Sequence, residues 1–136
     1  KGARMITQQK IDDLNNMFDT PLEMVREFTY AMGQPLDEKH GFSRRLEDMR
    51  WDLIKEEFGE VRDAIGYSEI LKELADLVYV TYGYAATYGW DLDEAVRRVH
   101  LSNMSKLGID GKPLKRPDGK VLKGPNYKKP DLSDLV

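Results

Sequence analysis

Apolar residues recur at helical spacing between residues 46 and 65, and one glutamate falls inside the stripe that they form. At about 100° per residue, the stripe covers about 120° of the helix circumference. Its members are Leu46, Leu53, Ile54, Val61 and Ile65. Glu57 lies within the stripe, while Glu56 and Glu60 lie along one edge of it. Because a buried carboxylate is strongly disfavoured unless it is paired or bound to a cation, we expect a positive group against this face.

Composition narrows the class of protein. The chain has 136 residues, of which 33% are charged and 40% hydrophobic, which is typical of one globular domain with a real core. Its net charge of −3 argues against a general nucleic-acid binder, so no nucleic-acid partner is expected. The absence of cysteine excludes disulfide scaffolds, thiolate metal sites and cysteine nucleophiles.

Location and processing are also expectations at this point. No apolar run reaches the ~20 residues that span a membrane, and the first residues do not resemble a signal peptide. We therefore expect a cytoplasmic protein without a membrane partner. Residues 1–4, which precede Met5, are typical of a remnant left by an expression tag.

Helices are predicted along most of the chain, followed by an irregular tail. A short amphipathic stretch comes first, at residues 11–18. Four helices are predicted after it, at residues 21–32, 44–65, 69–88 and 92–107. Thr20 and Glu23 form a capping-box pattern with Pro21 at the first helical position. Ser43, Ser68 and Asp91 are the expected caps of the next three helices, and Gly66 is the expected C-terminal cap of the second.

The third predicted helix is apolar on nearly every side over residues 77–82. Its β-branched residues leave a strand as the alternative, but apolar positions keep helical spacing to residue 85, which favours a helix. A helix that is apolar all round must be buried on several sides, which indicates a neighbouring subunit.

Turn signals dominate residues 108–136, and Pro117-Asp118-Gly119 predicts a small hairpin. This tail carries seven lysines and arginines on an otherwise acidic protein. It is either a solvated arm, or an arm that faces phosphates or wraps a second subunit.

Two acidic pairs carry the predicted chemistry. Glu57 and Glu60 are three residues apart on one helix, Glu73 and Asp76 have the same spacing on the next, and a short turn makes these helices antiparallel. Four carboxylates are then expected to converge, which suits Mg²⁺ or Mn²⁺ rather than zinc, and two or more ions rather than one. Glu56, at the edge, is placed to orient or deprotonate a water molecule. The alternative is that these acids form a solvated helix face.

A second candidate element closes the fourth helix. Asn103 and Lys106 are three residues apart, so on a helix they present an amide and an ammonium on the same face. The alternative is that Lys106 only complements the helix dipole.

At these residues the chain resembles the all-α nucleoside triphosphate pyrophosphohydrolases of the MazG-like superfamily. That group includes dimeric dUTPases, dCTP pyrophosphatases and phosphoribosyl-ATP pyrophosphohydrolases. Its E-E-x-x-E and E-x-x-D signature matches residues 56–60 and 73–76, with the gap at its short end. The resemblance covers about residues 20–107 and implies an all-α fold like a four-helix bundle. It divides the chain into a catalytic domain, 1–107, and an irregular tail, 108–136.

The resemblance also implies an activity. A nucleoside triphosphate would be cleaved between its α and β phosphates, giving a monophosphate and pyrophosphate, in a bacterial cell or a phage-infected host. The metal ligands would be Glu57, Glu60, Glu73 and Asp76, with Glu56 assisting the attacking water. Asn103 and Lys106 would contact phosphates, and Phe28 would contact the base.

Substrate and assembly follow from the same resemblance. A deoxynucleotide, dGTP or dCTP, is favoured. Phosphoribosyl-ATP is disfavoured, since enzymes that act on it are usually shorter and lack such a tail. A homodimer or a dimer of dimers is expected.

Two rival interpretations belong to other classes of protein. One is a non-catalytic helical oligomer that binds a nucleotide or a protein. The other is a structural oligomerisation module, whose acids would pair with neighbouring arginines: Arg44, Arg45, Arg50 or Arg62.

Overall fold

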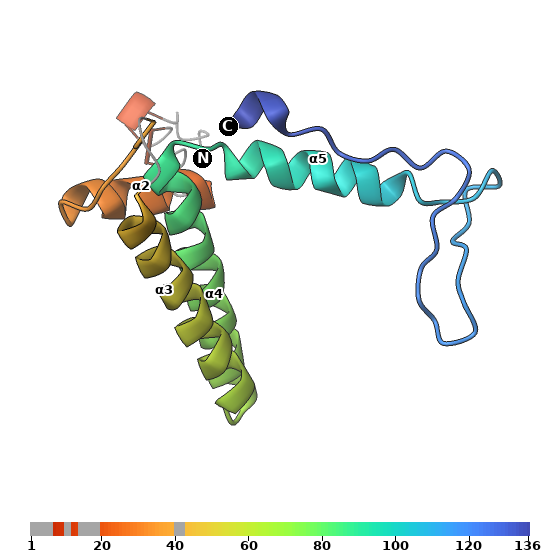
Figure 1. The fold of residues 1–136 in the computed structure, drawn as a ribbon, viewed down its shortest axis with the longest axis horizontal. Helices are drawn as coiled ribbons and strands as arrows, with labels where there is room; N and C mark the ends of the chain where they lie inside the picture. Colours follow the sequence, from red (N-terminus) through yellow and green to blue (C-terminus); the bar gives the residue numbers. More distant parts are fainter. Residues whose placement is uncertain (1–6, 10–11, 14–19, 40–42) are drawn as a thin grey trace, which may run out of the picture. The chain divides into compact units, whose positions relative to one another are not determined.

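A computed structural model describes residues 7–9, 12–13, 20–39 and 43–136. Over these residues the chain forms α-helices and no β-strand, so the predicted all-α class is confirmed (Figure 1). The helices are α2 (Pro21–Ala31), α3 (Arg44–Asp63), α4 (Tyr67–Tyr88) and α5 (Leu92–Met104), followed by the short 3₁₀ helix η1 (Ser133–Leu135). The amphipathic stretch predicted at 11–18 falls largely outside the described residues. None of the helices described has the length and apolar character needed to cross a bilayer.

The chain divides into two compact units, Lys1–Gly89 and Trp90–Val136. The first holds α2, α3 and α4, and the second holds α5 and the tail. The predicted division into a catalytic domain, 1–107, and a tail, 108–136, is a division by function. It stays a prediction.

In the first unit, α2 begins with the predicted capping box. The Thr20 hydroxyl accepts from the Glu23 amide at 3.3 Å, and the Glu23 carboxylate accepts from the Thr20 amide at 3.4 Å. The helix packs against α4 through its inner face, where Val25 is 2% exposed and Thr29 1%. α2 is thereby fixed at its first turn and along its buried side.

The turn between α3 and α4 differs from the prediction. α3 ends at Asp63, because Ala64 leaves the helix in an extended conformation. Gly66 does not cap α3 but precedes α4, and its φ of 92° favours glycine. α4 therefore begins at Tyr67, and Ser68 lies inside the helix rather than capping it. The Glu69 carboxylate accepts from the Ile65 amide at 3.3 Å, which supplies a partner in this turn.

The core of the first unit lies in the second half of α4. The most buried positions are Tyr82, Gly83, Ala85, Ala86 and Thr87. This half is a helix, so the strand alternative is wrong. Farther toward the start of α4, large apolar side chains remain exposed: Tyr67, Leu71, Leu74 and Val78. We call these four residues the α4 stripe.

In the second unit, α5 begins at Asp91, whose carboxylate accepts from the Glu94 amide at 3.0 Å. The helix ends at Met104, before the predicted residue 107. The tail replaces its last turn, because the Ser105 hydroxyl accepts from the Lys128 amide at 3.0 Å. The predicted hairpin is present as an isolated antiparallel bridge between Lys115 and Val121.

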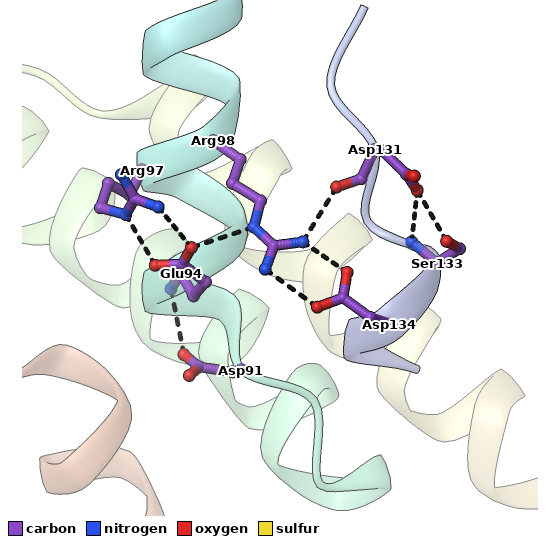
Figure 2. Close-up of polar contacts among 7 residues, drawn as sticks. All are labelled: Asp91, Glu94, Arg97, Arg98, Asp131, Ser133 and Asp134. Atoms are coloured by element: carbon purple, nitrogen blue, oxygen red, sulfur yellow. Dashed lines mark hydrogen bonds and ion pairs between the residues drawn. The ribbon is translucent and has the colours of Figure 1, made fainter.

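Hydrogen bonds and ion pairs join the end of the tail to α5, as Figure 2 shows. Arg98 donates to Glu94 at 2.9 Å, to the carboxylate of Asp134 and to the carbonyl of Asp131. Arg97 forms a second, two-pronged pair with Glu94. These contacts hold the end of the tail against α5, whereas residues 109–123 are exposed.

Candidate metal and nucleotide site

Three carboxylates meet where α3 and α4 pack side by side. Glu57 and Glu60 come from α3 and Glu73 comes from α4, and one oxygen of each lies within 4.8 Å of the others. The spacing of three residues puts Glu57 and Glu60 on one face of α3, and the short turn brings α4 back beside them. We call these three residues the acidic cluster.

Burial of the cluster is graded. Glu73 is 7% exposed, Glu57 is half-buried and Glu60 is exposed. The Oε2 atoms of Glu57 and Glu73 are both buried and have no hydrogen-bond partner among the residues that the structure describes. A buried acceptor without a partner costs free energy, and a charged one costs more. The cluster therefore has an unmet need for positive charge or for protons.

The raised pKa of Glu60 also indicates that the cluster favours a proton or a cation. The pKa of its carboxyl is raised above the ordinary value, first by a hydrogen bond with Glu73 and then by repulsion from Glu57. Carboxylates that share a site favour protonation of one member, because a proton relieves the repulsion between them. A bound cation would provide the same relief.

Asp76, the fourth predicted ligand, is not in the cluster. Its carboxylate pairs with Lys72 at 2.8 Å, and Lys72 also pairs with Glu73 at 3.0 Å. The pKa of Lys72 is raised by these two acids, Asp76 first. Lys72 was not identified from the sequence, although its spacing of four residues from Asp76 is a recognised ion-pair signal.

An open cavity of about 360 Å³ adjoins the acidic cluster. Glu60, Glu73 and Lys72 line it, together with Asp63, Ala64 and Glu69. Asp63 is already paired with Arg62 at 2.9 Å, so this arginine does not neutralise the cluster. Among the described residues, no ion pair joins the cluster to the arginines that the structural rival required.

Arg50 is a second buried charge between α3 and α4. It is 4% exposed, and its Nε and Nη2 atoms have no hydrogen-bond partner among the described residues. Burial lowers the pKa of its guanidinium. Arg50 lies two helical turns before Glu57, on the same face of α3. The sequence suggested Arg50 only as a possible ion-pair partner of the acids, and its burial was not expected.

The donor set of the cluster fits a hard divalent cation. All three side chains offer carboxylate oxygens, two of those oxygens are buried without partners, and the third carboxyl favours a proton. Mg²⁺ and Mn²⁺ prefer such ligands, whereas zinc prefers nitrogen and sulfur.

The remaining predicted site residues are not members of the acidic cluster. Glu56 is exposed on α3 next to Glu57. Phe28 is 40% exposed on α2, and its ring meets the ring of Tyr79 edge-on at 5.5 Å. Asn103 and Lys106 belong to the second unit, where Lys106 lies beyond the end of α5. These two residues are joined by the Lys106 amide, which donates to the Asn103 carbonyl at 3.2 Å.

Comparison with known proteins shows similarity to one family and to a viral protein. The family model described as phosphoribosyl-ATP pyrophosphohydrolase matches residues 25–103, which include the whole acidic cluster. An uncharacterized protein of Acanthamoeba polyphaga mimivirus is 35% identical over 92 residues. That match covers 60% of this chain and 36% of the relative, so the chain spans about a third of the relative's length.

Proposed function

This chain belongs to the phosphoribosyl-ATP pyrophosphohydrolase family, and from that premise we propose that it is a divalent-metal-dependent nucleotide pyrophosphohydrolase. It would cleave between the α and β phosphates and release a monophosphate and pyrophosphate. The observation that carries the proposal is the pair of buried carboxylate oxygens, one on Glu57 and one on Glu73, that have no hydrogen-bond partner within the described part of the chain. Their need for a cation matches the need of a triphosphate for charge neutralisation.

Glu57, Glu60 and Glu73 would hold Mg²⁺, with Mn²⁺ as a substitute and two or more ions in the site. Asp76 would join them once its carboxylate leaves Lys72. Bound metal supplies Lewis acidity at the phosphoryl oxygens and lowers the pKa of an attacking water. In the free protein Lys72 neutralises part of the negative charge of the site, through its ion pairs with Glu73 and Asp76.

The remaining roles belong to side chains around the cluster. Glu56, exposed beside Glu57, would accept the proton of the attacking water. Asn103 and Lys106 would contact the phosphate chain, and Phe28 would contact the base. A proton acceptor must lie within hydrogen-bond reach of the water, which an exposed carboxylate achieves by rotation of its side chain.

Two substrate classes fit the reaction. The first is a nucleoside triphosphate, with a deoxynucleotide, dGTP or dCTP, favoured. The second is phosphoribosyl-ATP, which is favoured by the description of the family model that matches residues 25–103. Both present a triphosphate chain that yields pyrophosphate on α–β cleavage.

A homodimer or a dimer of dimers would cover the α4 stripe, whose members Tyr67 and Leu71 are 94% and 69% exposed. Exposed apolar faces of this kind mark interaction sites. The working location would be the cytoplasm of a bacterial or phage-infected cell. Light scattering on the purified protein measures the oligomeric state directly.

The decisive experiment is a panel of all common nucleoside and deoxynucleoside triphosphates plus phosphoribosyl-ATP, each incubated with Mg²⁺ and analysed by chromatography. Monophosphate and pyrophosphate from at least one substrate would support the proposal. Glu73→Gln should abolish the release of pyrophosphate. Glu27→Gln, the same change at an exposed position of α2, should not. Binding without turnover across the whole panel would favour the non-catalytic oligomer.

A further inference from the structure

We propose that residues 106–129 form a preformed binding surface for short polyphosphates, the anionic chain of the substrate nucleotide. We call this segment the basic hairpin. The inference deepens the proposed function, since it names the residues that would recognise the triphosphate. It rests on three features of the second unit: a hydrogen-bonded scaffold, a concentration of positive charge, and a lack of internal partners for that charge.

The base of the basic hairpin is held to α5 and closed on itself. The Ser102 hydroxyl of α5 donates to the Lys128 carbonyl at 2.7 Å, and within the segment the Gly124 amide donates to the Lys106 carbonyl at 2.8 Å. Gly124 lies so close to the start of the segment that an added Cβ would be 2.3 Å from the carbonyl oxygen of Leu107. Only glycine permits this approach, because the contacting atom is backbone and cannot move aside.

The tip of the basic hairpin is also ordered by hydrogen bonds. The Leu122 amide donates to the Leu114 carbonyl at 2.7 Å, and the Arg116 amide donates to the Lys120 carbonyl at 2.9 Å. The Asp118 carboxylate accepts from the Lys120 amide at 3.1 Å and closes the turn. A surface that is ordered before binding loses less conformational entropy when a ligand arrives.

Charge is concentrated on this scaffold. The segment carries eight lysines and arginines against two aspartates, a net charge of +6, whereas the whole chain carries −3. The rest of the protein therefore carries −9. Lysine ammonium groups carried on one ordered segment raise the local concentration of anions.

The positive charge has few partners within the chain. Of the eight cations, only Arg116 forms an ion pair among the described residues, with Asp118 at 2.7 Å. The side chain of Lys123 lies over the ring of Tyr127, 4.7 Å from its centroid. Lys112, Lys115 and Lys120 are exposed. Their charges are available to an anion from outside the chain.

A short polyphosphate fits this surface better than a nucleic acid does. The surface is a single hairpin, and the remaining net charge of −9 would repel a long polyanion that extended beyond it. A triphosphate concentrates about four negative charges on three phosphorus centres, which several neighbouring ammonium groups can neutralise together. Lysine binds phosphate as a point charge and needs no fixed fork geometry.

The test measures binding of inorganic tripolyphosphate by calorimetry, with EDTA present so that the acidic cluster cannot contribute through metal. The variant is Lys115→Gln/Lys120→Gln/Lys123→Gln in the full chain. The matched control is Lys39→Gln/Arg45→Gln/Lys55→Gln, which removes the same charge from exposed positions of the first unit. We expect the hairpin variant to bind tripolyphosphate at least tenfold more weakly, and the control variant to stay within about twofold of the parent.

Any of three binding results would overturn the inference: no tripolyphosphate binding by the parent chain, equal weakening in both variants, or tighter binding of a single-stranded oligonucleotide than of tripolyphosphate. A changed oligomeric state in the hairpin variant, with anion binding intact, would also overturn it and assign the segment to subunit contact. The measurement needs no turnover, so failure of the proposed function would not decide it. Where turnover exists, the hairpin variant should raise KM and leave kcat within about twofold.

Discussion

The guanidinium of Arg50 lies against the backbone of Gly83, so closely that an added Cβ at position 83 would be 2.9 Å from Nη1. Arg50 reaches this place from α3 and is 4% exposed there. A glycine in the middle of α4 costs helix stability relative to alanine, about 1 kcal/mol. The packing of the two helices therefore uses that glycine to admit a buried cation.

Gly83→Ala should lower the free energy of unfolding by about 1 kcal/mol or more, since overpacking outweighs the gain in helix propensity. Gly59→Ala is the matched control, because this glycine of α3 has no heavy atom within 4 Å of an added Cβ. It should raise the free energy of unfolding by up to about 1 kcal/mol. Urea denaturation of both variants measures the difference. Equal stabilisation by the two alanines would show that Arg50 moves aside freely.

Glu73→Gln should raise the melting temperature in EDTA, because it removes one of three neighbouring carboxylates, two of which have buried oxygens without partners. The same variant should lose most of the stabilisation that Mg²⁺ gives the parent chain. Thermal melts in EDTA, and in a series of Mg²⁺ concentrations, measure both effects. A parent chain whose melting temperature ignores Mg²⁺ and Mn²⁺ would contradict the metal assignment.

Lys72→Met should lower the melting temperature in EDTA and enlarge the increase that Mg²⁺ produces. Lys72 neutralises Glu73 and Asp76 in the free protein, so it competes with a metal ion for the same oxygens. Lys55→Met is the control, since Lys55 pairs with Asp52 away from the acidic cluster. Calorimetric titration with Mg²⁺ gives the affinity. A weaker affinity in Lys72→Met than in the control would reject the competition.

Glu94 should titrate far below an ordinary glutamate, since Arg97 and then Arg98 lower the pKa of its carboxyl from 4.5 to about 2. A pKa lowered by folding contributes stability that is fully present above about pH 4.5 and is lost as the pH falls toward 2. The carboxyl ¹³C shift of Glu94 followed by NMR measures the midpoint. Arg97→Gln should move that midpoint upward, whereas Arg45→Gln should leave it in place.

Local patterns in the chain were enough to predict much of the fold. The capping box at Thr20 and the caps Ser43 and Asp91 are formed as expected, and α4 is a helix despite its β-branched residues. Helical spacing and capping act within a few residues, so a single sequence displays them. The main boundaries that differ lie in the turn between α3 and α4 and at the end of α5, and they depend on how the neighbouring segments pack.

The acidic residues illustrate what a sequence can and cannot specify. Spacing of three residues on antiparallel helices was sufficient to place Glu57, Glu60 and Glu73 together. It did not show that the carboxylate of Asp76 pairs with Lys72, because a spacing of four residues permits such an ion pair without requiring it. Nor could spacing show that two nitrogens of Arg50 would be buried without hydrogen-bond partners among the described residues.

By itself, then, the order of residues determined the helices, most of their caps and the two acidic pairs, since each of these arises between residues close along the chain. Only the tertiary structure decided which carboxylates face one another, that Gly83 accommodates Arg50, and that the tail replaces the last turn of α5. These depend on contacts between residues far apart in the chain, where the burial of a charge and the reach of a side chain depend on how two elements pack.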